Sequence, residues 1–212
     1  MRLLPDIELE QTSVVANCAM NRERRLAGYA KELGFDPVTV LRGSRAGWLD
    51  LCCGSGRALV EAAGQLPGVR IVGVDLVDTF APGPVDFVCA PAGTWTPDAP
   101  FDLITCVHGL HYVGDKLGLL CRAATWLTPT GRLVADLDLT AIRRTDGRPL
   151  GRPLATRLRA AGFEYNARRK RITLDGGREV RLPYRYVGAD PAAGPNYTGQ
   201  ESVHSHYADA NP

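Results

Sequence analysis

The middle of the chain alternates short, almost wholly apolar runs with longer segments whose apolar residues recur every three or four positions. The short runs have the length of buried β-strands and lie at 47–51, 69–75, 85–89, 101–107 and 132–139. Helical spacing is found between them, at 58–66 and 115–127. Strands that alternate with helices indicate βαβ units, so the pattern predicts an α/β fold with a mostly parallel sheet.

The segment before the first strand has a helical pattern. Apolar residues recur at helical spacing over 13–33, and Gly34 follows as a left-handed stop, so we expect an amphipathic helix there. A second, short helix is expected to begin after Asp36, which suits an N-cap, and to end at Gly43.

The C-terminal part has a different pattern of predicted elements from the middle of the chain. A short helix is expected at 154–160, followed by β-like runs at 163–174 and 178–187. The Asp-Gly-Gly sequence at 175–177 favours a hairpin turn between these two runs. A parallel sheet that ends in an antiparallel hairpin is therefore predicted, and the tail at 191–212 is either an ordered flap or a frayed end.

Length and composition place the chain among ordinary globular proteins. It has 212 residues, of which 45% are apolar and 23% charged, enough for one domain with a full hydrophobic core. We expect a helical segment at 1–44, a core at 45–190 and a tail at 191–212. The chain begins without a secretory pattern and has no apolar run of about 18 residues, so we expect a cytoplasmic protein that does not enter the membrane.

Charge and cysteine content argue against two classes of partner. The net charge of +2 is small for a nucleic-acid binder, and no aromatic-rich groove pattern accompanies the basic run at 168–171. The six cysteines show no CxxC spacing or zinc-type cluster, so we expect reduced thiols and no metal site. The oligomeric state is left open.

The first predicted strand runs directly into a glycine-containing turn. Its sequence, Trp-Leu-Asp-Leu-Cys-Cys-Gly-Ser-Gly-Arg at 48–57, places Gly54 and Gly56 before a helix. Glycines let the backbone approach a ligand closely, while helix N-terminal amides point toward it, so a nucleotide-like ligand is expected. A dinucleotide fold would need a third small residue where Leu59 stands, which weakens that alternative.

An acidic residue, Asp75, ends the second predicted strand about twenty residues after the glycines, where a carboxylate can accept both ribose hydroxyls. The alternative is that Asp75 is a strand-end turn residue. Two further segments matter: an Asp-led strand at 101–107 that continues into the loop 108–112, and a Thr-Pro-Thr-Gly turn at 128–131 before the fifth strand.

Together these segments, from about residue 45 to 140, resemble the class I S-adenosylmethionine-dependent methyltransferases. The resemblance implies a Rossmann-like, seven-stranded, mostly parallel sheet with a C-terminal antiparallel hairpin and an N-terminal helical lid. It departs from the family pattern at Cys52, which stands where the first glycine of the turn is expected. The residues that the resemblance assigns to S-adenosylmethionine binding are Asp50, Cys52, Gly54, Gly56, Asp75, Leu76, Ala92 and Cys106.

One expected feature is missing. The family usually has an acidic residue after the third strand that accepts from the adenine amino group, but the sequence there is Cys-Ala-Pro-Ala-Gly-Thr-Trp at 89–95. We expect backbone groups near Ala92, together with packing on Trp95 or Leu76, to hold the adenine instead.

The loop after the fourth strand supplies the candidate catalytic groups. Methyl transfer from a sulfonium needs mainly positioning, but a general base assists when the acceptor carries a proton. His111 is the first choice of base, with His108 and Tyr112 beside it; the alternative is that the histidines only shape the pocket. The helix over 13–33 is expected to close over the acceptor side, with Arg22, Arg25 and Tyr29 lining the pocket or forming a solvated face.

The resemblance leaves the reaction open in two respects. The expected function is transfer of a methyl group from S-adenosylmethionine to a small molecule through its oxygen, nitrogen or carbon. A chain with this pattern could also use the cofactor for chemistry other than methyl transfer, or be an inactive binding module on the same fold.

Overall fold

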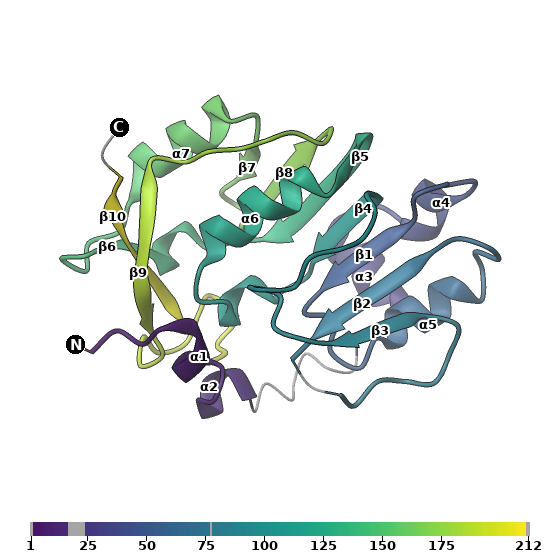
Figure 1. Ribbon diagram of the computed structural model, residues 1–212, viewed down its shortest axis with the longest axis horizontal. Coiled ribbons are helices and arrows are strands. Elements are labelled where there is room, and N and C mark those ends of the chain that lie inside the picture. The colour runs from purple at the N-terminus through teal and green to yellow at the C-terminus, as the bar shows by residue number, and fades with distance from the viewer. Residues whose placement is uncertain (1, 17–23, 77, 211–212) are drawn as a thin grey trace.

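The computed structural model describes residues 2–16, 24–76 and 78–210, and a seven-stranded sheet forms its centre (Figure 1). The strand order is β3-β2-β1-β4-β5-β8-β7. The strands are β1 (Trp48–Leu51), β2 (Ile71–Asp75), β3 (Asp86–Cys89), β4 (Phe101–Cys106), β5 (Leu127–Asp136), β7 (Glu164–Asn166) and β8 (Arg171–Asp175). The strands β1 to β5 pair in parallel, while β8 runs antiparallel to β5 and β7 antiparallel to β8. The predicted α/β class and the five parallel strands are confirmed.

Helices cover both faces of this sheet and bury two apolar layers (Figure 1). One face carries α3 (Leu26–Leu33), α4 (Pro37–Leu41) and α5 (Arg57–Ala63); the other carries α6 (Lys116–Thr125) and α7 (Gly151–Ala160). Side chains of β1 alternate between the layers, so that Trp48 packs with α3 and Leu49 faces the α6 side. The carboxyl ends of the parallel strands meet at one edge, where such sheets bind ligands.

A second, smaller sheet lies beside the first and has the strand order β6-β10-β9. Its strands are β6 (Ile142–Arg144), β9 (Tyr184–Asp190) and β10 (His204–Asp209). The structure also has two short 3-10 turns, η1 (Leu110–Tyr112) and η2 (Leu139–Ala141). The segment predicted as a tail is therefore ordered over β10, which forms the central strand of this second sheet.

The predicted hairpin turn is in the wrong place. The antiparallel hairpin at the end of the main sheet is formed by β7 and β8, whose connection lies at 167–170 rather than 175–177. Gly176 and Gly177 instead end β8, where their amides donate to Gly131 O and Thr128 O at 2.7 and 2.9 Å. The chain then leaves the sheet and enters the second one as β9. The Asp-Gly-Gly sequence does favour a turn, but hydrogen bonds to the β5 segment place this turn at the end of β8 and not between two paired strands.

The predicted helix over 13–33 is also corrected. The structure has α2 (Ser13–Ala16) and α3, and residues 17–23, which include Arg22, lie outside the described residues. The side chain of Tyr29 on α3 is buried against the sheet, and Arg25 at its start forms an ion pair with Glu61 of α5 at 2.7 Å. The α3 part is therefore a structural layer and does not cover the cleft.

The N-terminal α1 (Asp6–Leu9) lies beside the second sheet, as the purple ribbon next to β9 in Figure 1 shows. Leu4 and Ala189 form a backbone bridge, with N to O distances of 2.8 and 2.9 Å. In the part of the chain that the structure describes, no helix combines the length and apolar character needed to cross a membrane.

Candidate cofactor site

The turn after β1 adopts the left-handed backbone that its glycines suggest. The φ angles are +58° at Cys52, +62° at Gly54 and +69° at Gly56. Cys52 thus takes up the conformation that glycine would adopt more easily, despite its Cβ. At Gly56 the reason for glycine is also steric, because a Cβ there would lie 2.1 Å from the ring of Phe87.

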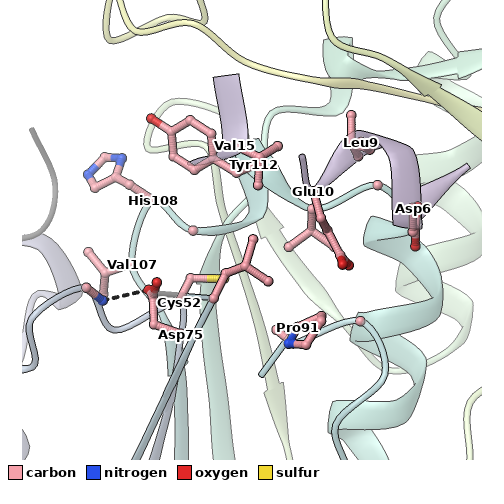
Figure 2. Close-up of a pocket in the computed structure, with 17 residues that line it drawn as sticks. Asp6, Leu9, Glu10, Val15, Cys52, Asp75, Pro91, Val107, His108 and Tyr112 are labelled. Atoms are coloured by element: carbon pink, nitrogen blue, oxygen red, sulfur yellow. Dashed lines mark hydrogen bonds between the residues drawn. The ribbon is translucent and has the colours of Figure 1, made fainter. Parts of the chain in front are cut away.

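A hydrogen bond joins this turn to the end of β2. The amide of Gly54 donates to Asp75 Oδ2 at 2.8 Å, drawn as the dashed line in Figure 2. The bond holds the Asp75 carboxylate beside the glycine turn, at the carboxyl edge of the sheet. The turn and the strand-two acid, which are far apart in the sequence, are brought together as predicted.

A cavity of about 830 Å³, including its open mouth, lies at this edge of the sheet (Figure 2). Its wall contains the glycine turn, the end of β2, the loop after β3, the loop after β4 and the N-terminal segment. The lining residues are Asp6, Leu9, Glu10, Val15, Cys52, Gly54, Asp75, Leu76, Pro91, Ala92, Gly93, Val107, His108, Gly109, Tyr112, Val113 and Gly114. The described lining contains three carboxylates and no lysine or arginine.

The cavity wall includes most of the predicted cofactor residues. Cys52, Gly54, Asp75, Leu76 and Ala92 line it. Pro91 and Gly93 lie beside Ala92 on the wall, so the backbone of this loop reaches the cavity, as expected for an adenine contact.

The three other assigned residues, and Trp95, which is expected to pack on the adenine, lie away from this wall. Gly56 packs against Phe87, and Cys106 is buried beneath the turn beside Cys52. Trp95 packs edge-on against Trp126, with ring centroids 6.0 Å apart, instead of facing the cavity. Asp50 is wholly buried.

Asp50 has a structural role between β1, β4 and α3. Its carboxylate accepts hydrogen bonds from the hydroxyls of Tyr29, at 2.7 Å, and Thr105, at 2.5 Å. Burial raises the pKa of Asp50 to about 7, although both hydrogen bonds act in the opposite direction. Asp50 thus does not line the described cavity, and its carboxylate connects α3 and β4 to β1.

This environment predicts a pH dependence of stability. Between about pH 4 and pH 7, Asp50 is protonated in the folded protein and ionised in the unfolded chain, so unfolding releases a proton and stability falls as pH rises. We expect a loss of about 1.4 kcal/mol per pH unit from this group. In Asp50→Asn that contribution is absent. Urea unfolding of both proteins across this range tests the effect, and parallel pH profiles would contradict it.

His108 stands on the cavity wall with carboxylates around it. Its backbone is left-handed, with φ at +58°, and its amide donates to Asp136 Oδ2 at 3.1 Å. Its Nε2 atom lies 3.6 Å from Glu32 Oε2 and 3.8 Å from Asp136 Oδ2. Burial lowers the pKa of His108, while Asp136 and Glu32 act to raise it. The lowered pKa favours the neutral ring, and the two carboxylates can stabilise the ring once it takes a proton.

His111, the first choice of base, lies outside the described cavity wall. Only 1% of it is exposed, and its ring centroid is 5.4 Å from that of Tyr197. Burial, reinforced by Lys116, lowers the pKa of His111 to about 3. Tyr112 does line the cavity, and its hydroxyl donates to Gln200 at 3.1 Å. Of the two histidines, only His108 is among the described lining residues of the cavity.

The sequence pattern missed the N-terminal contribution to this cavity. Asp6, Leu9, Glu10 and Val15 line it, although they precede the first strand by more than thirty residues. No spacing or motif in this segment indicates a site. Its position depends on the pairing of Leu4 with the second sheet, which the hydrophobic pattern did not predict.

An open α/β sheet with a glycine turn, a strand-two acid and a cavity at its carboxyl edge defines a nucleotide-type cofactor-binding domain. A family model described as a methyltransferase domain matches residues 19–148, more than half of the chain. The chain therefore belongs to this methyltransferase domain family.

Two curated proteins that are similar to this chain are also named methyltransferases. The chain is 30% identical over 135 residues to a demethylmenaquinone methyltransferase of Deinococcus radiodurans, covering 57% of this chain and 51% of that protein. It is 33% identical over 114 residues to a trans-aconitate 2-methyltransferase of Streptomyces avermitilis, covering 48% of this chain and 39% of that protein. The chain thus spans about half the length, or less, of these relatives.

Among solved structures, the N-methyltransferase NodS of Bradyrhizobium japonicum, in complex with S-adenosyl-L-homocysteine, is similar with a TM-score of 0.49 and 14% sequence identity. That similarity covers 79% of this chain and 95% of NodS.

Proposed function

We propose that this chain binds S-adenosylmethionine in the described cavity and transfers its methyl group to a small-molecule acceptor. The observation that carries the proposal is the charge of the cavity wall: three carboxylates and, among the described lining residues, no lysine or arginine. A ligand with sulfonium and ammonium groups suits such a wall, whereas the pyrophosphate of a dinucleotide does not. Membership of a methyltransferase family supports the same conclusion.

The residues present fit this cofactor. Gly54 exposes backbone to the cavity without a side chain, and the Asp75 carboxylate beside it is placed to accept hydrogen bonds from ribose hydroxyls. The loop at 91–93 is placed for the adenine ring. When bound, S-adenosylmethionine supplies an already activated methyl group, so the protein's main task is to position the acceptor and exclude water.

His108 is proposed as the general base. It lines the cavity, and Asp136 and Glu32 are placed to stabilise the imidazolium that forms when the ring accepts a proton. A base is useful only if the acceptor carries a proton, so this arrangement favours a hydroxyl or a protonated amine. Tyr112 is proposed to help orient the acceptor, and His111 to support the ring of His108, whose centroid is 5.9 Å away.

The names of the relatives suggest which acceptors to test first. Their names mention trans-aconitate and demethylmenaquinone, which makes these compounds reasonable first members of a screen. Release of S-adenosylhomocysteine separates methyl transfer from other chemistry of the cofactor, and its absence with every acceptor would favour an inactive binding module. We also propose that the protein acts in the cytoplasm and that the segment at 1–44 forms a distinct part of the domain.

Calorimetry tests cofactor binding. We expect S-adenosylmethionine to bind with a Kd in the micromolar range, about −8 kcal/mol, and NAD to bind far more weakly. Asp75→Ala should weaken S-adenosylmethionine binding by about 1.5–3 kcal/mol, because the ribose hydroxyls lose a charged partner. Asp86→Ala, an exposed acid on neighbouring β3, is the matched control. Tight NAD binding without S-adenosylmethionine binding would overturn the proposal.

A further inference from the structure

One end of the cavity is covered by a segment that the proposed methyl transfer does not use. Glu10 lies at the end of α1, and Figure 2 shows its carboxylate extending from that segment toward the loop at Pro91. This end of the cavity is separated along the wall from the glycine turn and His108. A part of a ligand that lies at this end is therefore away from His108, the proposed base.

The second sheet holds this segment in place. Leu4 pairs with Ala189 of β9, and Leu9, which is 1% exposed, packs against Ala189 and Val203. The hydroxyl of Tyr186, also on β9, donates to Asp6 Oδ1 at 2.6 Å. Glu10 is thus carried by a segment with both backbone and side-chain anchors, which makes it suitable for specific recognition.

The two carboxylates of this segment differ in their partners. Asp6 is already engaged by Tyr186, whereas Glu10 accepts a hydrogen bond from no other residue that the structure describes. Burial, together with the nearby Asp6, raises the pKa of Glu10. Since no described side chain donates to the Glu10 carboxylate, a ligand that brings an N–H group to this position can supply a donor.

The chemistry of the cofactor provides such a group. If Asp75 binds the ribose, the base lies beyond it, along the loop at 91–93 where Glu10 is placed. The 6-amino group is the one N–H donor on the adenine ring, and the described residues 89–93 after β3 contain no acidic side chain to accept from it. We propose that Glu10 accepts a hydrogen bond from the adenine 6-amino group and thereby selects adenine over 6-oxo purines. This inference rests on the proposed function.

A pair of ligands that differ at this position tests the assignment. S-Adenosylhomocysteine carries the 6-amino group, whereas S-inosylhomocysteine carries a 6-oxo group that faces the Glu10 carboxylate as an acceptor and repels it. By calorimetry we expect the wild-type protein to prefer the adenosyl compound by about tenfold or more. In Glu10→Gln the side-chain amide can donate to the 6-oxo group as well as accept from the 6-amino group, so the preference should fall to within about threefold.

Glu8→Gln is the matched control. Glu8 lies on the same helix but pairs with Arg2 at 2.9 Å and does not line the cavity, so this variant should keep the wild-type preference. An unchanged preference in Glu10→Gln, with a melting temperature equal to wild type, would overturn the role of Glu10 while leaving the proposed function intact. Failure of the wild-type protein to bind S-adenosylhomocysteine would overturn both.

Discussion

Replacing His108 with asparagine is expected to lower the turnover rate by about 100-fold or more while the Kd for S-adenosylmethionine stays within about twofold. The loss follows from removing the group that accepts the proton of the acceptor. Asparagine suits the left-handed backbone at this position, where φ is +58°, so the variant keeps the loop conformation. The measurement is the rate of S-adenosylhomocysteine release with the acceptor identified by screening.

The pH profile separates a base from a packing residue. Because His108 must be neutral to accept a proton, the wild-type rate should fall as pH decreases through its pKa, which burial sets below the usual value of 6.5. In His108→Asn this fall in rate at low pH should be absent. His204→Asn, on β10 and off the described cavity wall, serves as the control for a general histidine effect. Wild-type turnover in His108→Asn would favour the alternative that this ring only shapes the pocket.

Removal of residues 1–33 is expected to unfold the domain rather than to open a lid. The truncated chain loses α3, whose Leu26, Tyr29 and Leu33 are buried against the sheet. Burial of each such side chain contributes about 1.5–3 kcal/mol, so the free energy of unfolding falls by about 5 kcal/mol or more. This is comparable with the whole stability of a typical domain. It also leaves Asp50 buried without its Tyr29 partner. The truncated chain should show neither a cooperative thermal unfolding transition nor binding of S-adenosylmethionine in a titration.

A shorter truncation isolates the role of the N-terminal segment. Removal of residues 1–16 keeps α3 and deletes α1 and α2, which carry the four cavity residues of the N-terminal segment. We expect this variant to melt cooperatively but to bind S-adenosylmethionine more weakly. A cooperatively folded chain lacking residues 1–33 would contradict the structural role of α3, and unchanged cofactor affinity in the shorter truncation would contradict the role of α1 and α2 as a cover.

The parallel part of the fold and the cofactor turn could be predicted because their signals are local. Buried strands appear as apolar runs, and the approach of a ligand to the backbone requires glycine at positions such as Gly54. The place of Asp75 follows from topology alone, since the ends of adjacent parallel strands meet at one edge. Cys52, the departure from the expected glycine, takes a left-handed conformation there despite its Cβ, with φ at +58°.

The sequence by itself therefore determined the α/β class, the positions of the five parallel strands along the chain and the glycine turn with Asp75 at its side. Only the tertiary structure decided that Asp50 is buried under α3, that His108 rather than His111 faces the cavity, and that Glu10 joins its wall. These features depend on contacts between residues far apart in the chain, such as Leu4 with Ala189. Periodicity reports which face of an element is apolar, but it does not report which distant element will cover that face.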